Sequence, residues 1–357
     1  MATQFQTLTV RAVERLTRDA VMLSFDVPEG LADAFAFEPG QYLTLRATID
    51  GEDVRRSYSI CAAAGDGLRV GVKEVAGGRF STYANRALSA GDAVEVMPPM
   101  GRFKATVGGR HSYLCIAAGS GITPILSIAE SVLTAEPESS VTLVYGNRDT
   151  GSIMFREALE ALKDRFLSRF TLIHILSREA QDVELLHGRI DGARLTRLAR
   201  AGAIDPAGAD AVFLCGPGDM IDGAEEALTA LGTAPEKIHY ERFTPADGGA
   251  PRAPRSAAAE QAAEAGARVE VILDGGRRSF PLNGAKTVLD AAHDAGLEIP
   301  YSCAGGMCCT CRCKVLEGEA EMDVNYSLQP WEVEAGFVLA CQSRPTTEKL
   351  VLDFDAA

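Results

Sequence analysis

The chain has 357 residues, which at about 150 residues per domain predicts two or three domains. Its apolar fraction of 46% and charged fraction of 24% are those of a globular protein and exclude global disorder. The net charge of −14 disfavours binding to nucleic acids and to anionic lipid surfaces. Because we find neither a membrane-spanning apolar run nor a signal peptide pattern, we expect a cytosolic protein without a membrane or nucleic acid partner.

Residues 1–106 alternate short strand-like segments with glycine and proline turns. Evenly spaced short strands of this kind indicate a small antiparallel β-barrel, which we expect as the first domain. The expected strands cover residues 7–16, 21–27, 41–49, 55–60, 68–75 and 93–98.

Residues 107–247 show a different pattern, in which buried-strand runs alternate with helical segments. Alternation of strand and helix indicates βαβ units, so we expect an α/β domain with a parallel sheet. The expected strands cover 112–118, 141–147, 170–177 and 211–217, and the expected helices cover 125–135 and 155–166.

Residues 248–267 are rich in alanine, proline and glycine and lack large apolar side chains, so we interpret them as a linker with a short helix in its AAAEQAAEA stretch. Residues 268–357 form the last expected domain. It begins with an alternating hairpin over 269–282, whose turn is Gly-Gly, and continues with an amphipathic helix over 287–297. The acidic balance of this domain fits a face that docks an electron acceptor, and it equally fits an ordinary solvated surface.

Six of the nine cysteines lie in the last 55 residues. Clustered thiols in a reducing compartment more often serve a metal or redox role than form disulfides. Cys303, Cys308 and Cys311 have the C-x4-C-x2-C spacing of a plant-type 2Fe-2S site, and Cys341, after an apolar run that we expect to be a strand, supplies the fourth ligand.

Two other sites compete with this interpretation. A structural zinc site usually pairs two C-x2-C knuckles, and only one such knuckle has a clear partner here. A redox-active C-x-x-C would need a thioredoxin-like context. Cys309 and Cys313 can each replace a neighbour in the ligand set, although strand alternation makes Cys313 a packed thiol, and we assign both as non-ligands. The last domain resembles a plant-type ferredoxin, which implies an α+β β-grasp fold.

The first 245 residues resemble the ferredoxin-NADP reductase family, beginning with its R-x-Y-S flavin motif at Arg56, Ser57, Tyr58 and Ser59. The resemblance implies that the arginine meets the flavin phosphates, that the tyrosine packs on the isoalloxazine face and that Ser59 hydrogen-bonds near the flavin N5. A fixed cation, a flat amphipathic ring and a small donor suit these three roles. A strand with alternating polar residues is the alternative.

A second flavin element, the family's G-x-x-S, matches Gly78, Arg79, Phe80 and Ser81 before a helical stretch. Amides at a helix start suit a diphosphate, so the resemblance implies FAD rather than FMN. The alternative is a turn followed by an ordinary helix cap.

The nicotinamide elements of the family follow in the second domain. Its G-x-G-x-x-P turn matches Gly119, Ser120, Gly121, Thr123 and Pro124, with Thr123 as the expected side-chain contact. The turn places a helix N-terminus near the dinucleotide phosphates.

Three further matches complete the nucleotide site. The C-G-P element matches Cys215, Gly216 and Pro217 beside the expected nicotinamide, after what we interpret as the last parallel strand. Ser177 and Arg178 match the S-R segment that meets the adenosine 2′-phosphate, which favours NADPH over NADH as co-substrate. Glu241 and Phe243 are candidates for the acidic and aromatic element near the flavin, and Ser59, Cys215 and Glu241 are the expected catalytic residues.

As a whole, and especially in residues 317–355 and 239–245, the chain resembles the reductases of multicomponent phenylacetyl-CoA epoxidases. The resemblance implies an oxidoreductase that passes electrons from NADPH to FAD, to a 2Fe-2S cluster and then to a separate di-iron oxygenase component. A reductase of a steroid or aromatic-ring hydroxylase and a non-enzymatic redox binding module remain alternatives.

Overall fold

Six antiparallel strands make up the first sheet of the computed structural model, which describes residues 4–243, 254–284 and 286–356. The sheet order is β4-β3-β6-β1-β2-β5. All six predicted strands are confirmed: β1 Gln6–Thr17, β2 Ala20–Asp26, β3 Tyr42–Ile49, β4 Glu52–Ser59, β5 Leu68–Lys73 and β6 Ala93–Val96. A bridge between Ile60 and Val70 joins the two edges, so the sheet closes into the predicted β-barrel.

The barrel core follows from strand alternation, because every second side chain points inward. Leu8 and Val10 of β1 and Leu23 of β2 are almost fully buried in it. Helix α1, Arg79–Arg86, adds Phe80 and Ala84 to the same core. The helix start is thereby fixed against the strands that carry the flavin motif.

The second sheet is parallel, in the order β11-β10-β7-β8-β9. Its strands are β7 Ser112–Ala118, β8 Ser140–Asn147, β9 Phe170–Leu176, β10 Ala211–Gly216 and β11 Ile238–Arg242. The four predicted strands are confirmed. The interpretation that Cys215 lies on the last parallel strand is wrong, since β11 follows it and forms the edge. The short, polar β11 segment carries too weak an apolar pattern to be identified from sequence.

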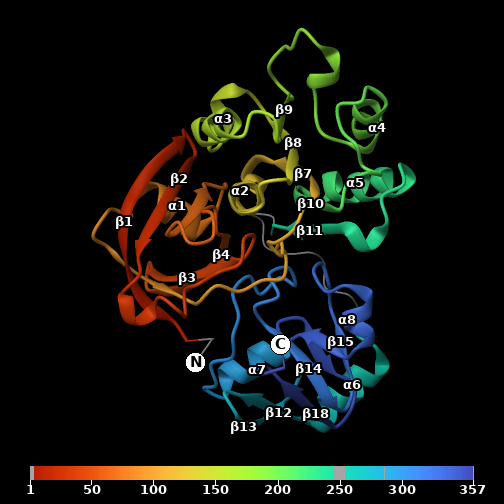
Figure 1. Ribbon diagram of the computed structural model, residues 1–357. Coiled ribbons are helices and arrows are strands. Elements are labelled where there is room, and N and C mark those ends of the chain that lie inside the picture. The colour runs from red at the N-terminus through yellow and green to blue at the C-terminus, as the bar shows by residue number, and fades with distance from the viewer. Residues whose placement is uncertain (1–3, 244–253, 285, 357) are drawn as a thin grey trace. The chain divides into compact units, whose positions relative to one another are not determined.

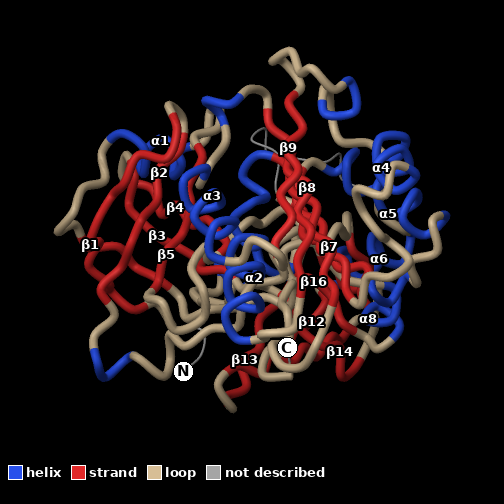
Figure 2. The backbone as a smooth tube through the Cα atoms, turned by 45° about the horizontal axis from the view of Figure 1, so that its top comes forward, coloured by secondary structure: helices blue, strands red, loops and turns tan. Residues whose placement is uncertain are grey.

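Helices cover both faces of this sheet (Figure 1 and Figure 2). The predicted helices α2 Ile122–Ala135 and α3 Arg156–Arg165 pack on one face, and α4 Gly192–Arg200 and α5 Gly218–Ala230 pack on the other. In this doubly wound arrangement the carboxyl ends of the strands meet at one edge, where α/β proteins bind ligands. The short 3-10 helices are η1 Glu29–Leu31, η2 Gly119–Gly121, η3 Thr150–Ser152, η4 Glu184–Leu186 and η5 Pro235–Lys237.

The last part of the chain forms a separate compact unit, within residues 244–357. Its mixed sheet has the order β13-β12-β18-β14-β16, with α7 packed on it through Val288, Leu289 and Ala292. The predicted hairpin, helix and cysteine-flanking strand are confirmed as β12–β13, α7 and β16. The elements are β12 Ala267–Leu273, β13 Gly276–Leu282, α7 Val288–Asp294, β14 Arg312–Glu317, β15 Ala320–Met322, α8 Pro330–Glu334, β16 Phe337–Leu339, β17 Ser343–Pro345 and β18 Lys349–Asp353.

The predicted linker contains the expected short helix, α6 Ala257–Ala265. The Ser256 side chain caps its start by accepting from the Ala259 amide at 3.2 Å, and Gly266, with φ of +77°, ends it. Ala259 and Ala262 are buried, so the helix packs within the last unit, next to β12 and β17. Residues 248–253 of the predicted linker lie outside the described residues.

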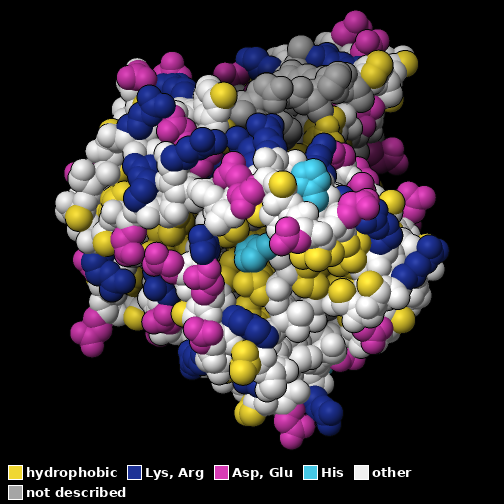
Figure 3. Space-filling model, turned by 90° about the horizontal axis from the view of Figure 1, so that it is seen from above, with side chains coloured by type: hydrophobic (Ala, Val, Ile, Leu, Met, Phe, Trp, Pro, Cys, Tyr) yellow, Lys and Arg dark blue, Asp and Glu magenta, His cyan; other side chains and the backbone are white. Residues whose placement is uncertain are grey.

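Charged side chains of both signs are interspersed on the face shown in Figure 3. Among the residues that the structure describes, no helix combines the length and apolarity that crossing a membrane requires.

Candidate functional site

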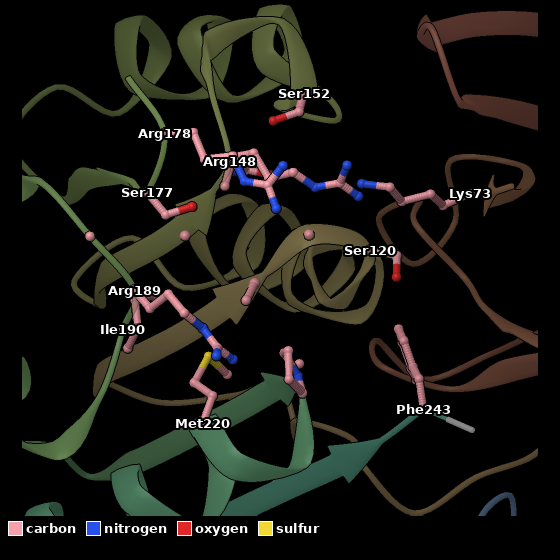
Figure 4. A pocket seen from close by; sticks show the side chains of 17 residues that line it. Lys73, Ser120, Arg148, Ser152, Ser177, Arg178, Arg189, Ile190, Met220 and Phe243 are labelled. Carbon is pink, nitrogen blue, oxygen red and sulfur yellow. The ribbon is translucent and has the colours of Figure 1, made fainter. Parts of the chain in front are cut away.

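A cavity of about 650 Å³ lies at the carboxyl edge of the parallel sheet (Figure 4). Ser120 comes from the turn after β7, Arg148 follows β8, Ser177 and Arg178 follow β9, and Pro217 follows β10. Phe243, which follows β11, also lines the cavity, so each of the five strands contributes through the residues at its end. This is the position at which doubly wound sheets bind nucleotides.

The glycine turn at the start of α2 is packed too tightly for any side chain at Gly121. A Cβ atom there would lie 2.1 Å from the backbone oxygen of Cys215. Thr123 is 2% exposed and donates through Oγ1 to the Ser120 carbonyl at 3.0 Å. Gly119 and Ser120 line the cavity, whereas Thr123 and Pro124 are buried in α2 and shape the turn from behind.

The cavity mouth is rich in cations. Along one side of it, Figure 4 shows Arg148, Arg178 and Lys73. Among the described residues, Lys73 has one ion pair, a loose one in which its Nζ lies 3.9 Å from Asp19, and no ion pair is found for Arg148 or Arg178. Arg189, also in the lining, pairs with Asp219 at 2.7 Å. Burial lowers the pKa of Lys73, Asp19 opposes this effect and the charge of Arg148 adds to it. Cations that face one another in this way favour a bound anion.

Sequence reasoning found Ser177 and Arg178 but missed Arg148, Arg189 and Lys73. Arg148 could have been found, because it directly follows Gly-Asn at the end of a predicted parallel strand, as Arg178 follows the next one. Lys73 lies at the end of β5 in the barrel, and its place in the cavity depends on how the barrel packs against the α/β half. No local pattern indicates it.

The three predicted catalytic residues lie together where the barrel meets the parallel sheet. Ser59, at the end of β4, donates through Oγ to Glu241 Oε2 at 2.9 Å. Glu241 on β11 is directly opposite Cys215 on β10 in the parallel register. Cys215 is fully buried, and burial raises the pKa of its thiol. Burial also raises the pKa of Glu241 to about 7, although the hydrogen bond from Ser59 partly offsets this effect.

The R-x-Y-S residues occupy successive positions on β4. Arg56 is exposed and donates to the Arg55 carbonyl at 2.6 Å. Ser57 is half-buried, with its Oγ 3.4 Å from Thr44 Oγ1. The Tyr58 ring lies 5.6 Å from the Phe80 ring of α1. The strand thus presents a guanidinium and an aromatic ring side by side, which fits a phosphate joined to a flat ring system.

The G-x-x-S residues form the first turn of α1. A Cβ atom at Gly78 would lie 2.4 Å from both Ser81 Oγ and Val75 Cγ2. Ser81 Oγ accepts from the Val75 amide at 3.2 Å and donates to the Gly78 carbonyl at 3.1 Å, while Arg79 pairs with Glu52. No side chain caps α1, so its first-turn amides are the groups that can meet an anion.

The four predicted cluster ligands form two hydrogen-bonded thiol pairs. Cys303 pairs with Cys308, and Cys311 pairs with Cys341. Among the described residues, no group of three or more His, Cys, Asp or Glu side chains is arranged to hold a single metal ion. Two pairs of thiols fit a binuclear cluster, in which each iron takes two cysteines in addition to the bridging sulfides.

Backbone amides of the loop converge on these sulfurs. The Gly305 amide lies 3.3 Å from Cys303 Sγ, and those of Met307 and Cys308 also donate to it. The bond from the Cys308 thiol and these amides lower the pKa of Cys303 against the effect of burial. The Gly306 amide donates to Cys341 in the same way. Amides directed at sulfur stabilise the thiolates that a cluster needs, so the loop fits a 2Fe-2S group.

Neither additional cysteine belongs to the two pairs. Cys313 is fully buried on β14, with Sγ 3.8 Å from the Val338 carbonyl, and burial raises its pKa. Cys309 has a left-handed φ of +56° and donates to Ser327 Oγ at 3.0 Å. Both have protein partners other than the predicted ligands.

Comparison with protein families identifies the same three parts. Residues 7–105 match the family described as oxidoreductase FAD-binding domain, and residues 115–226 match oxidoreductase NAD-binding domain. Residues 271–346 match 2Fe-2S iron-sulfur cluster binding domain.

Individual proteins resemble the chain over almost its whole length. It is 49% identical to one of the subunits of 1,2-phenylacetyl-CoA epoxidase of Escherichia coli K12, with 99% of both chains covered. It is 38% identical to the ferredoxin reductase component of 3-ketosteroid-9-alpha-monooxygenase of Rhodococcus rhodochrous, with 97% of this chain and 96% of that one covered. Phthalate dioxygenase reductase has a similar structure, with a TM-score of 0.59, 26% identity and 98% of both chains covered. The chain belongs to the ferredoxin reductase family, as an oxidoreductase with FAD-binding, NAD-binding and 2Fe-2S domains.

Proposed function

We propose that the chain is the NADPH-dependent reductase of a multicomponent phenylacetyl-CoA epoxidase and delivers electrons to a separate di-iron oxygenase component in the cytoplasm. The 49% identity over 99% of the chain to the Escherichia coli epoxidase protein supports this assignment. The proposal divides the chain into a flavin domain (1–106), a nucleotide domain (107–247), a linker (248–267) and a ferredoxin domain (268–357).

The single observation that carries the reductase chemistry is the Ser59–Glu241 hydrogen bond beside Cys215, whose chain neighbours Gly216 and Pro217 line the nucleotide-sized cavity. When bound, FAD accepts two electrons as hydride from NADPH, and the 2Fe-2S cluster takes electrons one at a time. With a pKa of about 7, the Glu241 carboxyl holds a proton in about half of the molecules at neutral pH. It orients the Ser59 hydroxyl, so the pair can hold and return a proton at Ser59 Oγ.

The remaining residues bind and orient. Arg56 and the first turn of α1, from Gly78 through Arg79 and Phe80 to Ser81, would hold the FAD phosphates, and Ser57 and Tyr58 would line the ring. Gly119, Ser120, Gly121, Thr123 and Pro124 shape the turn for the dinucleotide phosphates, and Gly216 and Pro217 follow Cys215 beside the nicotinamide. Ser177 and Arg178, with Arg148, would bind the 2′-phosphate that distinguishes NADPH from NADH.

The cluster ligands in this proposal are Cys303, Cys308, Cys311 and Cys341. Cys311 and Cys341 are 2% and 4% exposed, whereas Cys303 and Cys308 are half-buried. An acceptor would therefore approach the cluster from the side of Cys303 and Cys308.

The test is NADPH consumption by the FAD- and cluster-loaded chain with a purified phenylacetyl-CoA oxygenase component, with and without phenylacetyl-CoA. We expect consumption to rise, with epoxide formed, only when the oxygenase and the thioester are both present. A 3-ketosteroid oxygenase in place of the first component is the matched control. Turnover with the steroid system alone would contradict the assignment.

A further inference from the structure

Gln342 directly follows Cys341 in the chain and is 7% exposed. Its side-chain Nε2 donates to the Ala304 carbonyl at 2.9 Å and to Cys341 Sγ at 3.4 Å. A carbonyl and a thiolate can only accept hydrogen bonds, so the NH2 end of the amide must face both of them. The orientation of the side chain follows from its partners.

The backbone of Gln342 is held on both sides. Its amide donates to the Leu339 carbonyl at 2.8 Å, and its carbonyl accepts from the Asp323 amide at 2.9 Å. The side-chain donor is therefore placed in advance and loses little freedom when it bonds to sulfur.

The same side chain supports two unusual backbone positions in the cysteine loop. Ala304 has φ of +50°, which is strained for any residue other than glycine, and Gln342 holds its carbonyl. Gly306 has φ of +76°, and a Cβ atom there would lie 3.2 Å from Gln342 Cγ. Gln342 thus lies against the loop at Ala304 and Gly306, at the beginning of the stretch whose amides point at the ligand sulfurs.

We propose that Gln342 is a positioning residue that raises the reduction potential of the 2Fe-2S cluster through its hydrogen bond to Cys341 Sγ. The inference rests on the proposed function, because it takes Cys341 as a cluster ligand. Reduction adds one negative charge to the cluster, so a donor to a ligand sulfur stabilises the reduced form more than the oxidised form. The bond therefore favours transfer of an electron from the flavin to the cluster.

The test is the variant Gln342→Met in the full-length, FAD- and cluster-loaded protein, with Gln261→Met at an exposed site of α6 as the matched control. Methionine keeps the length and bulk of glutamine but has no N–H group. In an anaerobic redox titration followed by electron paramagnetic resonance, we expect Gln342→Met to shift the equilibrium between reduced and oxidised cluster at least threefold toward the oxidised form. For a one-electron couple this shift is about 28 mV toward lower potential. A smaller shift, or an equal shift in the control, overturns the proposal.

A second variant separates the sulfur bond from support of the strained turn. Glycine at position 304 relieves the left-handed strain, so Ala304→Gly combined with Gln342→Met should hold its cluster even where Gln342→Met alone does not. We expect the redox equilibrium of the cluster in the double variant to remain shifted at least threefold toward the oxidised form, relative to Ala304→Gly. A return to the value of Ala304→Gly would show that Gln342 acts only on the backbone, which also overturns the proposal.

A spectroscopic readout tests the hydrogen bond itself. After exchange into D2O, electron-nuclear double resonance of the reduced cluster should detect a deuteron coupling that Gln342→Met removes and Gln261→Met retains. An unchanged set of couplings contradicts the proposal. Neither measurement needs an oxygenase, so failure of this inference leaves the proposed function standing, whereas absence of any cluster in the wild-type protein would overturn the proposed function first.

Discussion

The buried ion pair between Arg344 and Asp323 should contribute strongly to the stability of the cluster-bearing unit. The side chains are 5% and 4% exposed, and two bonds of 2.9 and 2.8 Å join Nε and Nη2 of Arg344 to the two carboxylate oxygens. Arg344 also donates to the Lys286 carbonyl at 2.8 Å. Arg344 thereby connects Asp323, which follows β15, to Lys286, which precedes α7.

The perturbation is Asp323→Asn, which keeps the shape of the side chain but removes the negative charge that faces the buried Arg344 guanidinium. Breaking a buried pair from one side costs about 3–5 kcal/mol. Because asparagine can still accept one of the two bonds, we expect about 3 kcal/mol, a large share of the about 5–15 kcal/mol that stabilises a domain. For a unit of this size, 3 kcal/mol lowers the midpoint of thermal unfolding by roughly 12–24 °C.

The assay is the loss of cluster absorbance on heating, recorded beside flavin absorbance as an internal reference. The matched control is Glu317→Gln, which removes the exposed pair with Lys349, whose side chains are 57% and 51% exposed. Exposed pairs contribute about 0–1 kcal/mol, so this midpoint should move by only a few degrees. Equal shifts in the two variants would refute the reasoning that burial makes the Asp323 pair important.

Three further predictions concern the site. Cys341→Ser should abolish cluster absorbance while NADPH still reduces the flavin, and a surviving unaltered cluster would show that Cys341 is no ligand. Arg178→Ala should weaken binding of NADPH at least tenfold more than binding of NADH, as measured by titration of the oxidised protein. Arg200→Ala on α4 is the control. Equal losses of affinity for the two nucleotides would contradict the assignment of Arg178 to the 2′-phosphate. Burial raises the pKa of Glu241 to about 7, so its carboxyl releases a proton as pH rises through 7. The rate of flavin reduction should therefore change between about pH 6 and 8, and Glu241→Gln should remove this change. A Glu241→Gln variant with the wild-type pH profile would contradict the prediction.

Sequence predicts the parts of this protein that depend on local pattern. The spacing of Cys303, Cys308 and Cys311 placed these residues in one loop, because ligand geometry requires few residues between neighbouring thiols. Short strand-like segments between glycine and proline turns identified all six barrel strands, and buried apolar runs identified four of the five parallel strands. Sequence missed β11 because only five residues form it and most of them are partly exposed.

The remaining features of the site depend on contacts between segments that are far apart in the sequence. Ser59 and Glu241 are 182 residues apart, and only packing of the barrel on the parallel sheet brings them within 2.9 Å. Lys73 reaches the nucleotide cavity for the same reason. Gln342 follows a cysteine in an otherwise ordinary stretch, and its role depends on the left-handed turn at Ala304 on the opposite side of the loop.

The most direct test of the electron path is anaerobic stopped-flow mixing of the loaded protein with NADPH, with flavin and cluster absorbance followed separately. We expect the flavin to bleach first and the cluster to be reduced afterwards, with Cys341→Ser showing the first phase alone. Cluster reduction that precedes flavin bleaching, or that persists after the FAD is removed, would contradict the proposed order of transfer.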